Sequence, residues 1–124
     1  MFLIYIGKDF KKICKHPNLT EDFIDEYFWR LKPYGLERHQ VLSPYIIFKY
    51  QNALNWQIMS ETQELTEQMI EIKYKFVNWS DISQHQKLSY EFIKKWTKFL
   101  KWDLMLYNKN LSPDLLLKVQ NLFK

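Results

Sequence analysis

Apolar positions recur along the chain with a period of 23 residues. A leucine followed by a serine or threonine marks each recurrence: Leu19, Leu42, Leu65, Leu88 and Leu111. Counted from that leucine, most residues at positions 1, 5, 6, 9, 12 and 13 are apolar, which is the spacing of an amphipathic helix. The hydroxyl at position 2 is a typical helix N-cap. Each unit therefore predicts a first helix of about three turns.

An aromatic column predicts a second, shorter helix in each unit. Trp56, Trp79 and Trp102 share one phase, and an isoleucine or methionine follows each of them three residues later. Residues three apart share one face of a helix, so we expect the pair to pack inward. Pro33 occupies the tryptophan slot of the first unit, and residues 9–17 look like the second helix of an incomplete leading unit.

Repeated helix pairs predict the fold, because stacking buries apolar stripes that one pair leaves exposed. We expect an all-α protein, an α-solenoid of alternating long and short helices in 23-residue repeats, with a single domain over residues 1–124. The expected parts are an N-terminal cap with a partial repeat (1–17), four repeats (18–40, 41–63, 64–86 and 87–109) and a C-terminal capping helix (110–124). Within the cap, residues 1–6 do not match the repeat and are expected to be irregular or strand-like.

Composition narrows the class of protein. The chain is 47% hydrophobic and 18% aromatic, so it can bury a core. It has a single cysteine, Cys14, which excludes an internal disulfide and a Cys-based zinc site. No apolar stretch is long enough for a membrane span, and the N-terminus lacks the marks of a signal peptide. We expect a soluble, cytoplasmic protein with no membrane partner.

Charge is distributed unevenly. Residues 1–20 carry a net charge of +3, residues 21–72 carry −5 and residues 73–124 carry +6. The acidic middle would repel a phosphate backbone, so a continuous nucleic-acid track is not expected.

One stretch carries a family resemblance. Residues 79–93 fit the motif W-x-x-I-S-x-x-Q-x-L-S-x-x-F-I, which is similar to tandem repeats in uncharacterised proteins of giant DNA viruses and phages. The resemblance covers residues 18–124, most closely 42–102, and departs at Pro33, Leu106 and Lys109. It implies a viral protein with a helical-repeat fold, located in the host cell cytoplasm, whose partner is a host or defence-system protein. It implies no catalytic residues.

Candidate chemistry is sparse. His16, His39 and His85 share one phase of the repeat, so we expect neighbours in that column to lie about 10 Å apart, too far to share a metal ion. Cys14 occupies the slot of Ser60 and Ser83 and is interpreted as a small packing residue. Motifs for phosphate binding, dinucleotide binding or nucleophilic catalysis are absent from the sequence. We expect no metal, no cofactor and no enzymatic activity.

A glutamine column closes each unit at Gln40, Gln63 and Gln86, with Lys109 in the fourth slot. Helical RNA-binding repeats read bases with such side chains. The column lies at the tight junction before the next helix cap, however, where an amide can satisfy backbone groups of the loop. We favour this structural role.

Apolar residues on the outward face of the first helices break the pattern and suggest a binding surface. The candidate protein-binding anchors are Trp29, Tyr45, Phe48 and Ile72. Aromatic anchors among charged residues are typical of protein interfaces. An alternative is that these side chains pack sideways between neighbouring first helices. The leading hypothesis is a non-catalytic module that binds a protein partner.

Two further interpretations stay open. The C-terminal half could bind nucleic acid through a basic surface formed by Lys73, Lys75, Lys94, Lys95, Lys98 and Lys101. Residues 103–107 are more apolar than the corresponding residues of other units, so they could pack on the C-terminal helix or form a homodimer contact.

Overall fold

The computed structural model describes residues 9–124, which are helical with no strand in that range. The all-α prediction is therefore confirmed for the described residues, whereas the expected cap over residues 1–6 lies outside them. The chain divides into two compact units, Met1–Asn55 and Trp56–Lys124. A search of the described helices found none with the length and apolar character that crossing a membrane requires.

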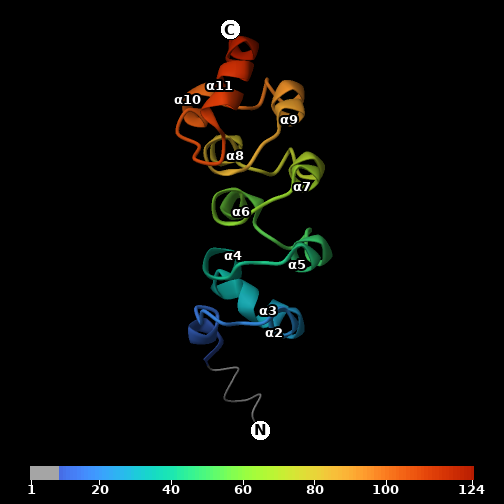
Figure 1. Cartoon of the computed structure of the whole chain (residues 1–124). Helices are drawn as coiled ribbons and strands as arrows, with labels where there is room; N and C mark the ends of the chain where they lie inside the picture. The colour runs from blue at the N-terminus through green and yellow to red at the C-terminus, as the bar shows by residue number, and fades with distance from the viewer. Residues whose placement is uncertain (1–8) are drawn as a thin grey trace. The chain divides into compact units, whose positions relative to one another are not determined.

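The first unit consists of short helices. After a helical segment over residues 9–13 come α2 (Glu21–Glu26), α3 (Phe28–Leu31), the 3₁₀ helix η1 (Lys32–Tyr34), α4 (Leu36–His39) and α5 (Pro44–Lys49). Helix α2 packs against α5, and α3 continues almost directly into η1 and α4 (Figure 1).

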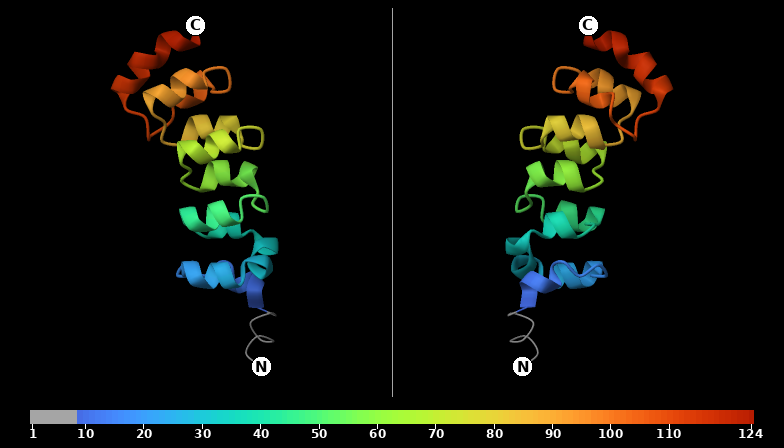
Figure 2. Two further views of the ribbon diagram at one scale, coloured as in Figure 1. Left: turned by 90° about the vertical axis from the view of Figure 1, so that its right-hand side faces the viewer. Right: turned by 90° about the vertical axis from the view of Figure 1, so that its left-hand side faces the viewer.

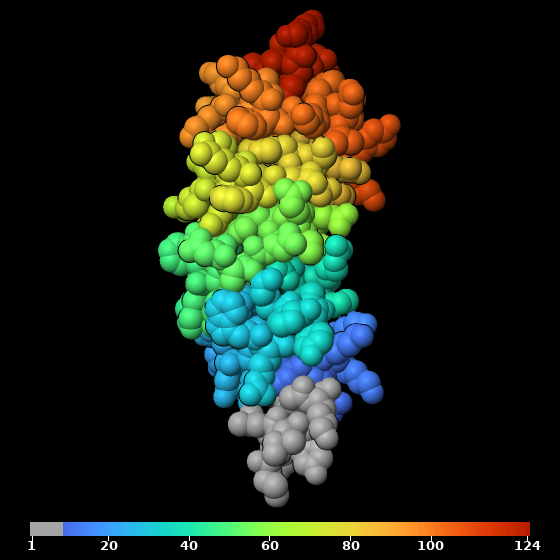
Figure 3. All heavy atoms as spheres, turned by 180° about the vertical axis from the view of Figure 1, so that it is seen from behind, coloured from blue at the N-terminus to red at the C-terminus, as the bar shows by residue number. Residues whose placement is uncertain are grey.

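The second unit repeats a two-helix pattern. Its elements are α6 (Trp56–Thr62), α7 (Glu67–Ile72), α8 (Trp79–His85), α9 (Tyr90–Lys95), α10 (Trp102–Met105), α11 (Pro113–Val119) and the 3₁₀ helix η2 (Gln120–Phe123). Helix α8 packs against both α6 and α10, and α9 packs against α11. Within this unit, α6, α8 and α10 lie along one side, and α7 and α9 along the other (Figures 1 and 2). In the space-filling view its successive segments form successive bands, from green to red (Figure 3).

Every leucine–hydroxyl junction lies at the start of a helix. The hydroxyl residue has an extended backbone, and its side-chain oxygen accepts a hydrogen bond from the N–H three residues later. These donor–acceptor distances are 3.1–3.3 Å at Thr20, Ser43, Thr66, Ser89 and Ser112. The predicted N-caps are therefore confirmed in both units.

The first helix of each repeat is shorter than the pattern predicts. Helices α5 and α7 each have six residues, while α6 and α8 have seven, so the expected alternation of long and short helices is wrong for these two repeats. In the fourth repeat α9, with six residues, is longer than α10, with four. The helix ends at position 9, where the carbonyl of Tyr50, for example, accepts bonds from the N–H groups of Ala53 and Leu54 at 2.9 and 3.1 Å. This separate turn keeps the helical i+3 and i+4 spacing, so the apolar pattern alone does not show the break.

Pro33 changes the first repeat in the way its chemistry requires. It lies at the start of η1, where its missing N–H costs little, and Gly35 then turns the chain with a positive φ of 83°. Helix α4 follows from Leu36. The column that starts at Leu36 still reaches the core, because Leu36, Met59, Ile82 and Met105 are all fully buried.

Buried side-chain amides bind the loops, as predicted for the glutamine column. The Nε2 of Gln40 donates to the carbonyls of Cys14 and His16 at 2.7 and 2.8 Å. Gln86 donates to the carbonyls of Ser60 and Gln63, and its Oε1 accepts from the N–H of Leu65 at 2.9 Å. Each amide therefore satisfies backbone groups that the short helices leave unpaired.

The fourth amide was not predicted. Asn108 is buried and its Nδ2 donates to the carbonyls of Ser83 and Gln86 at 2.8 Å each, while Lys109, in the expected slot, is exposed. Helix α10 has only four residues, so the side chain that bonds to the loop carbonyls comes one residue earlier than in the other repeats. A shorter amide side chain takes the role there.

A second repeat position, occupied by Glu37, Ser60 and Ser83, also forms side-chain hydrogen bonds to the backbone. Ser60 donates its hydroxyl to the carbonyl of Trp56 at 2.6 Å and accepts from the N–H of Asn78 at 2.9 Å. Ser83 repeats both bonds, with the N–H of Lys101 at 2.8 Å. Glu37 stands in the same slot of the first repeat, buried, and its Oε2 accepts from the N–H of Asn55 at 2.8 Å.

We predict that Gln86→Met lowers the free energy of unfolding by about 3 kcal/mol, because it leaves two carbonyls and one N–H without their buried partner. Gln68→Met, at an exposed position of α7, is the control. Urea unfolding followed by circular dichroism gives both values. Equal losses in the two variants would contradict the role of Gln86.

We predict that Ser43→Ala lowers the free energy of unfolding by about 1 kcal/mol, because it removes the hydroxyl that accepts from the N–H of Ile46 at 3.3 Å. Ser43→Thr keeps the acceptor and should lose much less. The same unfolding measurement compares the two, and the cap assignment fails if both substitutions have the same effect.

Candidate functional site

Among the exposed aromatic side chains of the first unit are the predicted anchors Trp29, Tyr45 and Phe48, which we call the α3–α5 aromatic surface. Their exposed fractions are 67%, 51% and 63%. Trp29 lies in α3, and the other two lie in α5. Trp29 contacts Tyr50 and Tyr45 bonds to Asp25 of α2, so there is some sideways packing, but it leaves all three side chains largely exposed.

The indole of Trp29 contacts a stacked pair of aromatic rings. Phe28 is fully buried and stacks on Tyr50, with ring centroids 3.7 Å apart and planes at 4°. The indole of Trp29 meets both rings edge-on, at 5.1 and 5.9 Å between centroids. Such contacts restrict the motion of an exposed ring, so Trp29 is held in place before any partner arrives.

A carboxylate network fixes α5 to α2. Asp25 accepts hydrogen bonds from the Nζ of Lys49 at 2.8 Å, from the hydroxyl of Tyr45 at 3.1 Å and from the hydroxyl of Tyr50. The bond from Lys49 and then that from Tyr50 hold the pKa of Asp25 below its usual value. The same bond raises the pKa of Lys49, and burial, followed by the bond to Asp25, raises the pKa of Tyr50.

The fourth predicted anchor belongs to the second unit. Ile72 is 50% exposed at the end of α7, and Phe76, four residues later, is 59% exposed. The repeat pattern assigned Phe76 to the inward stripe at position 12. Only position 13 is buried there, as Val77 shows, so Phe76 is a surface residue that the pattern missed.

The six lysines of the predicted basic surface have different environments. Lys73 is buried, with its Nζ 5.8 Å from the ring centre of Trp56 and 5.7 Å from that of Phe76. Lys95 forms an ion pair with Glu71 at 3.1 Å. The remaining four are exposed: Lys75, Lys94, Lys98 and Lys101. Glu71 has a lowered pKa, caused first by the indole N–H of Trp96 and then by Lys95.

The C-terminal part of the second unit also exposes apolar side chains. Leu106 is 52% exposed, Tyr107 74% and Leu117 65%, whereas Met105 of α10 is fully buried. Residues 106 and 107 thus lie outside the core, at the position that the sequence suggested for a homodimer contact.

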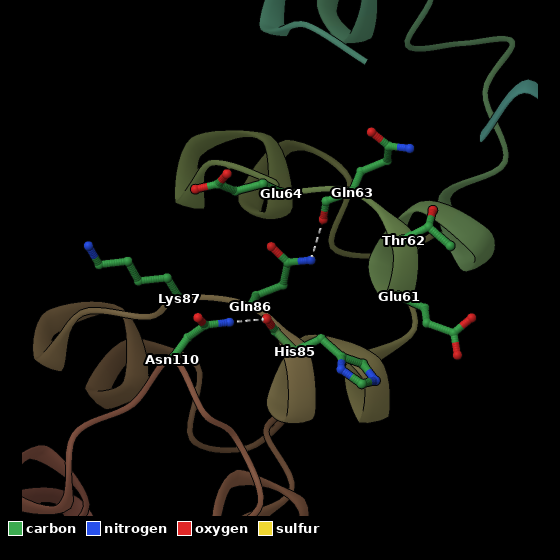
Figure 4. A pocket seen from close by; sticks show the side chains of 8 residues that line it. All are labelled: Glu61, Thr62, Gln63, Glu64, His85, Gln86, Lys87 and Asn110. Atoms are coloured by element: carbon green, nitrogen blue, oxygen red, sulfur yellow. Dashed lines mark hydrogen bonds between the residues drawn. The ribbon is translucent and has the colours of Figure 1, made fainter. Parts of the chain in front are cut away.

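A pocket of about 320 Å³ opens beside α6 and α8 (Figure 4). It is lined by Glu61, Thr62, Gln63, Glu64, His85, Gln86, Lys87 and Asn110. Two of these lining residues, Glu61 and His85, form a group with Asp81, in which one ligand atom of each residue lies within 4.8 Å of the others. Burial and the charge of Glu61 raise the pKa of Asp81, and His85 opposes this shift. The repeat phase relates the three histidines only to one another. It therefore does not predict this mixed group of a histidine and two carboxylates.

Cys14 has no exposed surface, and its thiol lies 3.6 Å from the carbonyl of Leu31, to which it donates. Burial, together with the nearby carboxylate of Glu37, raises the pKa of the thiol, so it stays protonated at neutral pH. This environment agrees with a packing role and not with a nucleophile.

Comparison with protein-family models, curated proteins and solved structures found no match to this chain.

We predict that the stabilisation given by Asp25 disappears in acid. Its folded pKa lies below the ordinary value near 3.8, so the contribution is complete above that value and is lost as the pH falls through the folded pKa. The thermal midpoint of Asp25→Asn should lie below that of the unmodified protein at neutral pH, and the gap should close in acid. Asp22→Asn, an exposed carboxyl of α2, is the control. A gap that does not change with pH would contradict the network.

Proposed function

We propose that the chain is a non-catalytic α-solenoid of 23-residue helical repeats that binds a protein partner. Within each unit, the hydroxyl caps and the buried amides recur at equivalent places, which supports a repeated building block. Repeat arrays of this kind commonly present extended binding surfaces.

The observation that carries this proposal is the exposure of Trp29 and Phe48, at 67% and 63%. Trp29 lies beside the stacked rings of Phe28 and Tyr50. Tryptophan and tyrosine dominate the energetics of protein interfaces, since they bury a large area with little loss of conformational freedom. Covering an aromatic side chain gains roughly 1.5–3 kcal/mol. The α3–α5 aromatic surface has the anchors that a partner needs, and Ile72 would serve in the second unit.

Charge near these anchors selects the partner's chemistry. Helix α2, which packs against α5, carries the exposed carboxylates of Glu21, Asp22 and Glu26. Of the nearby cations, the ammonium of Lys49 is paired with Asp25, and the guanidinium of Arg30 lies over the ring of Phe10. A protein segment with an apolar side chain flanked by lysine or arginine fits this arrangement. The resemblance to repeats of giant viruses and phages adds the proposal that this partner is a host protein of the cytoplasm.

Nucleic-acid binding is the second candidate, favoured by one observation in the second unit. Exposed Phe76 and Phe99 accompany the exposed lysines Lys75, Lys94, Lys98 and Lys101. Aromatic faces next to basic groups are typical of single-strand binding. The burial of Lys73 and the pairing of Lys95 with Glu71 reduce the surface available to phosphates.

The test starts with affinity purification of partners and continues with the dissociation constant of the partner found. The Trp29→Ala/Phe48→Ala double variant should weaken binding by at least about 30-fold, the effect of one hot-spot residue worth about 2 kcal/mol. The matched control is Tyr107→Ala/Leu117→Ala, which removes two equally exposed side chains from the second unit.

Three outcomes separate the hypotheses. Loss of binding in the first variant alone supports the anchors, and equal affinity in both variants overturns them. A nucleic-acid partner, with affinity that falls steeply with salt and is abolished by Lys94→Glu/Lys98→Glu, would replace protein binding by the second candidate.

A further inference from the structure

We propose that Glu61, Asp81 and His85 form a binding site for a divalent transition-metal ion, with Zn²⁺ the best fit. The site is independent of the proposed protein-binding surface, which uses other residues. Its three donor atoms already lie within 4.8 Å of one another, although the sequence separates them by up to 24 positions.

The fold brings the three side chains together from two packed helices. Asp81 and His85 are one turn apart on α8, and the Nε2 of His85 lies 3.9 Å from Oδ1 of Asp81. Glu61 comes from the last turn of α6, which packs against α8. In Figure 4 the Glu61 carboxylate and the His85 ring lie near each other at one end of the pocket.

The distances need only a small adjustment to hold an ion. Ligands at about 2.0 Å in a tetrahedral zinc site are about 3.3 Å from one another. Closing the present separations to that value takes rotamer changes in Glu61 and His85, whose side chains reach solvent.

The chemistry of the donors selects the class of metal. One imidazole and two carboxylates suit zinc and its first-row neighbours, whereas Mg²⁺ and Ca²⁺ prefer oxygen ligands alone. A cation also removes the repulsion between the neighbouring carboxylates of Glu61 and Asp81. Lys87 lines the same pocket, but its ammonium points away from His85 (Figure 4). The pocket has room for water to complete the coordination.

Metal binding here would act as a clamp. It would tie the end of α6 to α8, two helices whose only covalent link within the unit runs through α7. Because the ion binds the folded form, we expect Zn²⁺ to raise the thermal midpoint of the full chain.

The test titrates Zn²⁺ into the full-length, chelator-treated protein by calorimetry and follows Co²⁺ by visible absorption. We expect one ion per chain, and at least about tenfold weaker binding in each of Glu61→Gln, Asp81→Asn and His85→Gln. Glu64→Gln, in the same pocket, and His39→Gln, in α4, are matched controls that should bind normally. Circular dichroism without metal checks that every variant is folded.

The proposal is overturned if Zn²⁺ does not bind, if the three variants bind as well as the unmodified chain, or if the two controls lose as much affinity. Displacement of Zn²⁺ by equimolar Mg²⁺ would also overturn it, because that would indicate a simple acidic surface. Retained binding in the controls with loss in all three ligand variants supports it.

Discussion

Helices of only four to seven residues leave a large share of their backbone N–H and C=O groups without a partner inside the helix. The whole structure depends on supplying those partners where water is excluded. Hydroxyl caps do this at helix starts, and the buried amides of Gln40, Gln86 and Asn108 do it at the loops. In the described residues, no buried side-chain nitrogen or oxygen is left without a hydrogen bond. The apolar columns of the described residues then pack beside polar side chains whose buried atoms are already hydrogen-bonded.

Much of this fold could be predicted from the sequence, because caps and amides depend on residue type at a fixed spacing. The five hydroxyls and the roles of Gln40 and Gln86 follow from that spacing alone. The break after position 9 could not be predicted, since the separate turn preserves helical periodicity. Asn108 was missed for a related reason: the shorter α10 shifts the register by one residue, and a strict column count then points to Lys109.

Some residues of the candidate sites could likewise be predicted from the sequence, and others could not. Exposure of Trp29 and Phe48 follows from their outward phase on a helix, so the sequence was sufficient to find them. Phe76 was assigned inward because positions 12 and 13 are both apolar, and packing decides which of the two is buried. The group of Glu61, Asp81 and His85 depends on how α6 meets α8, and therefore appears only in three dimensions.

Hydrogen exchange tests the central claim most directly, because it reports on the individual backbone groups that side chains are said to satisfy. The N–H groups of Leu65, Asn78 and Lys101 lie outside the helices and donate to Gln86, Ser60 and Ser83. Their exchange measured by NMR should be as slow as that of N–H groups in the middle of α8. Exchange at the rate of an unstructured chain at these three positions would contradict the account.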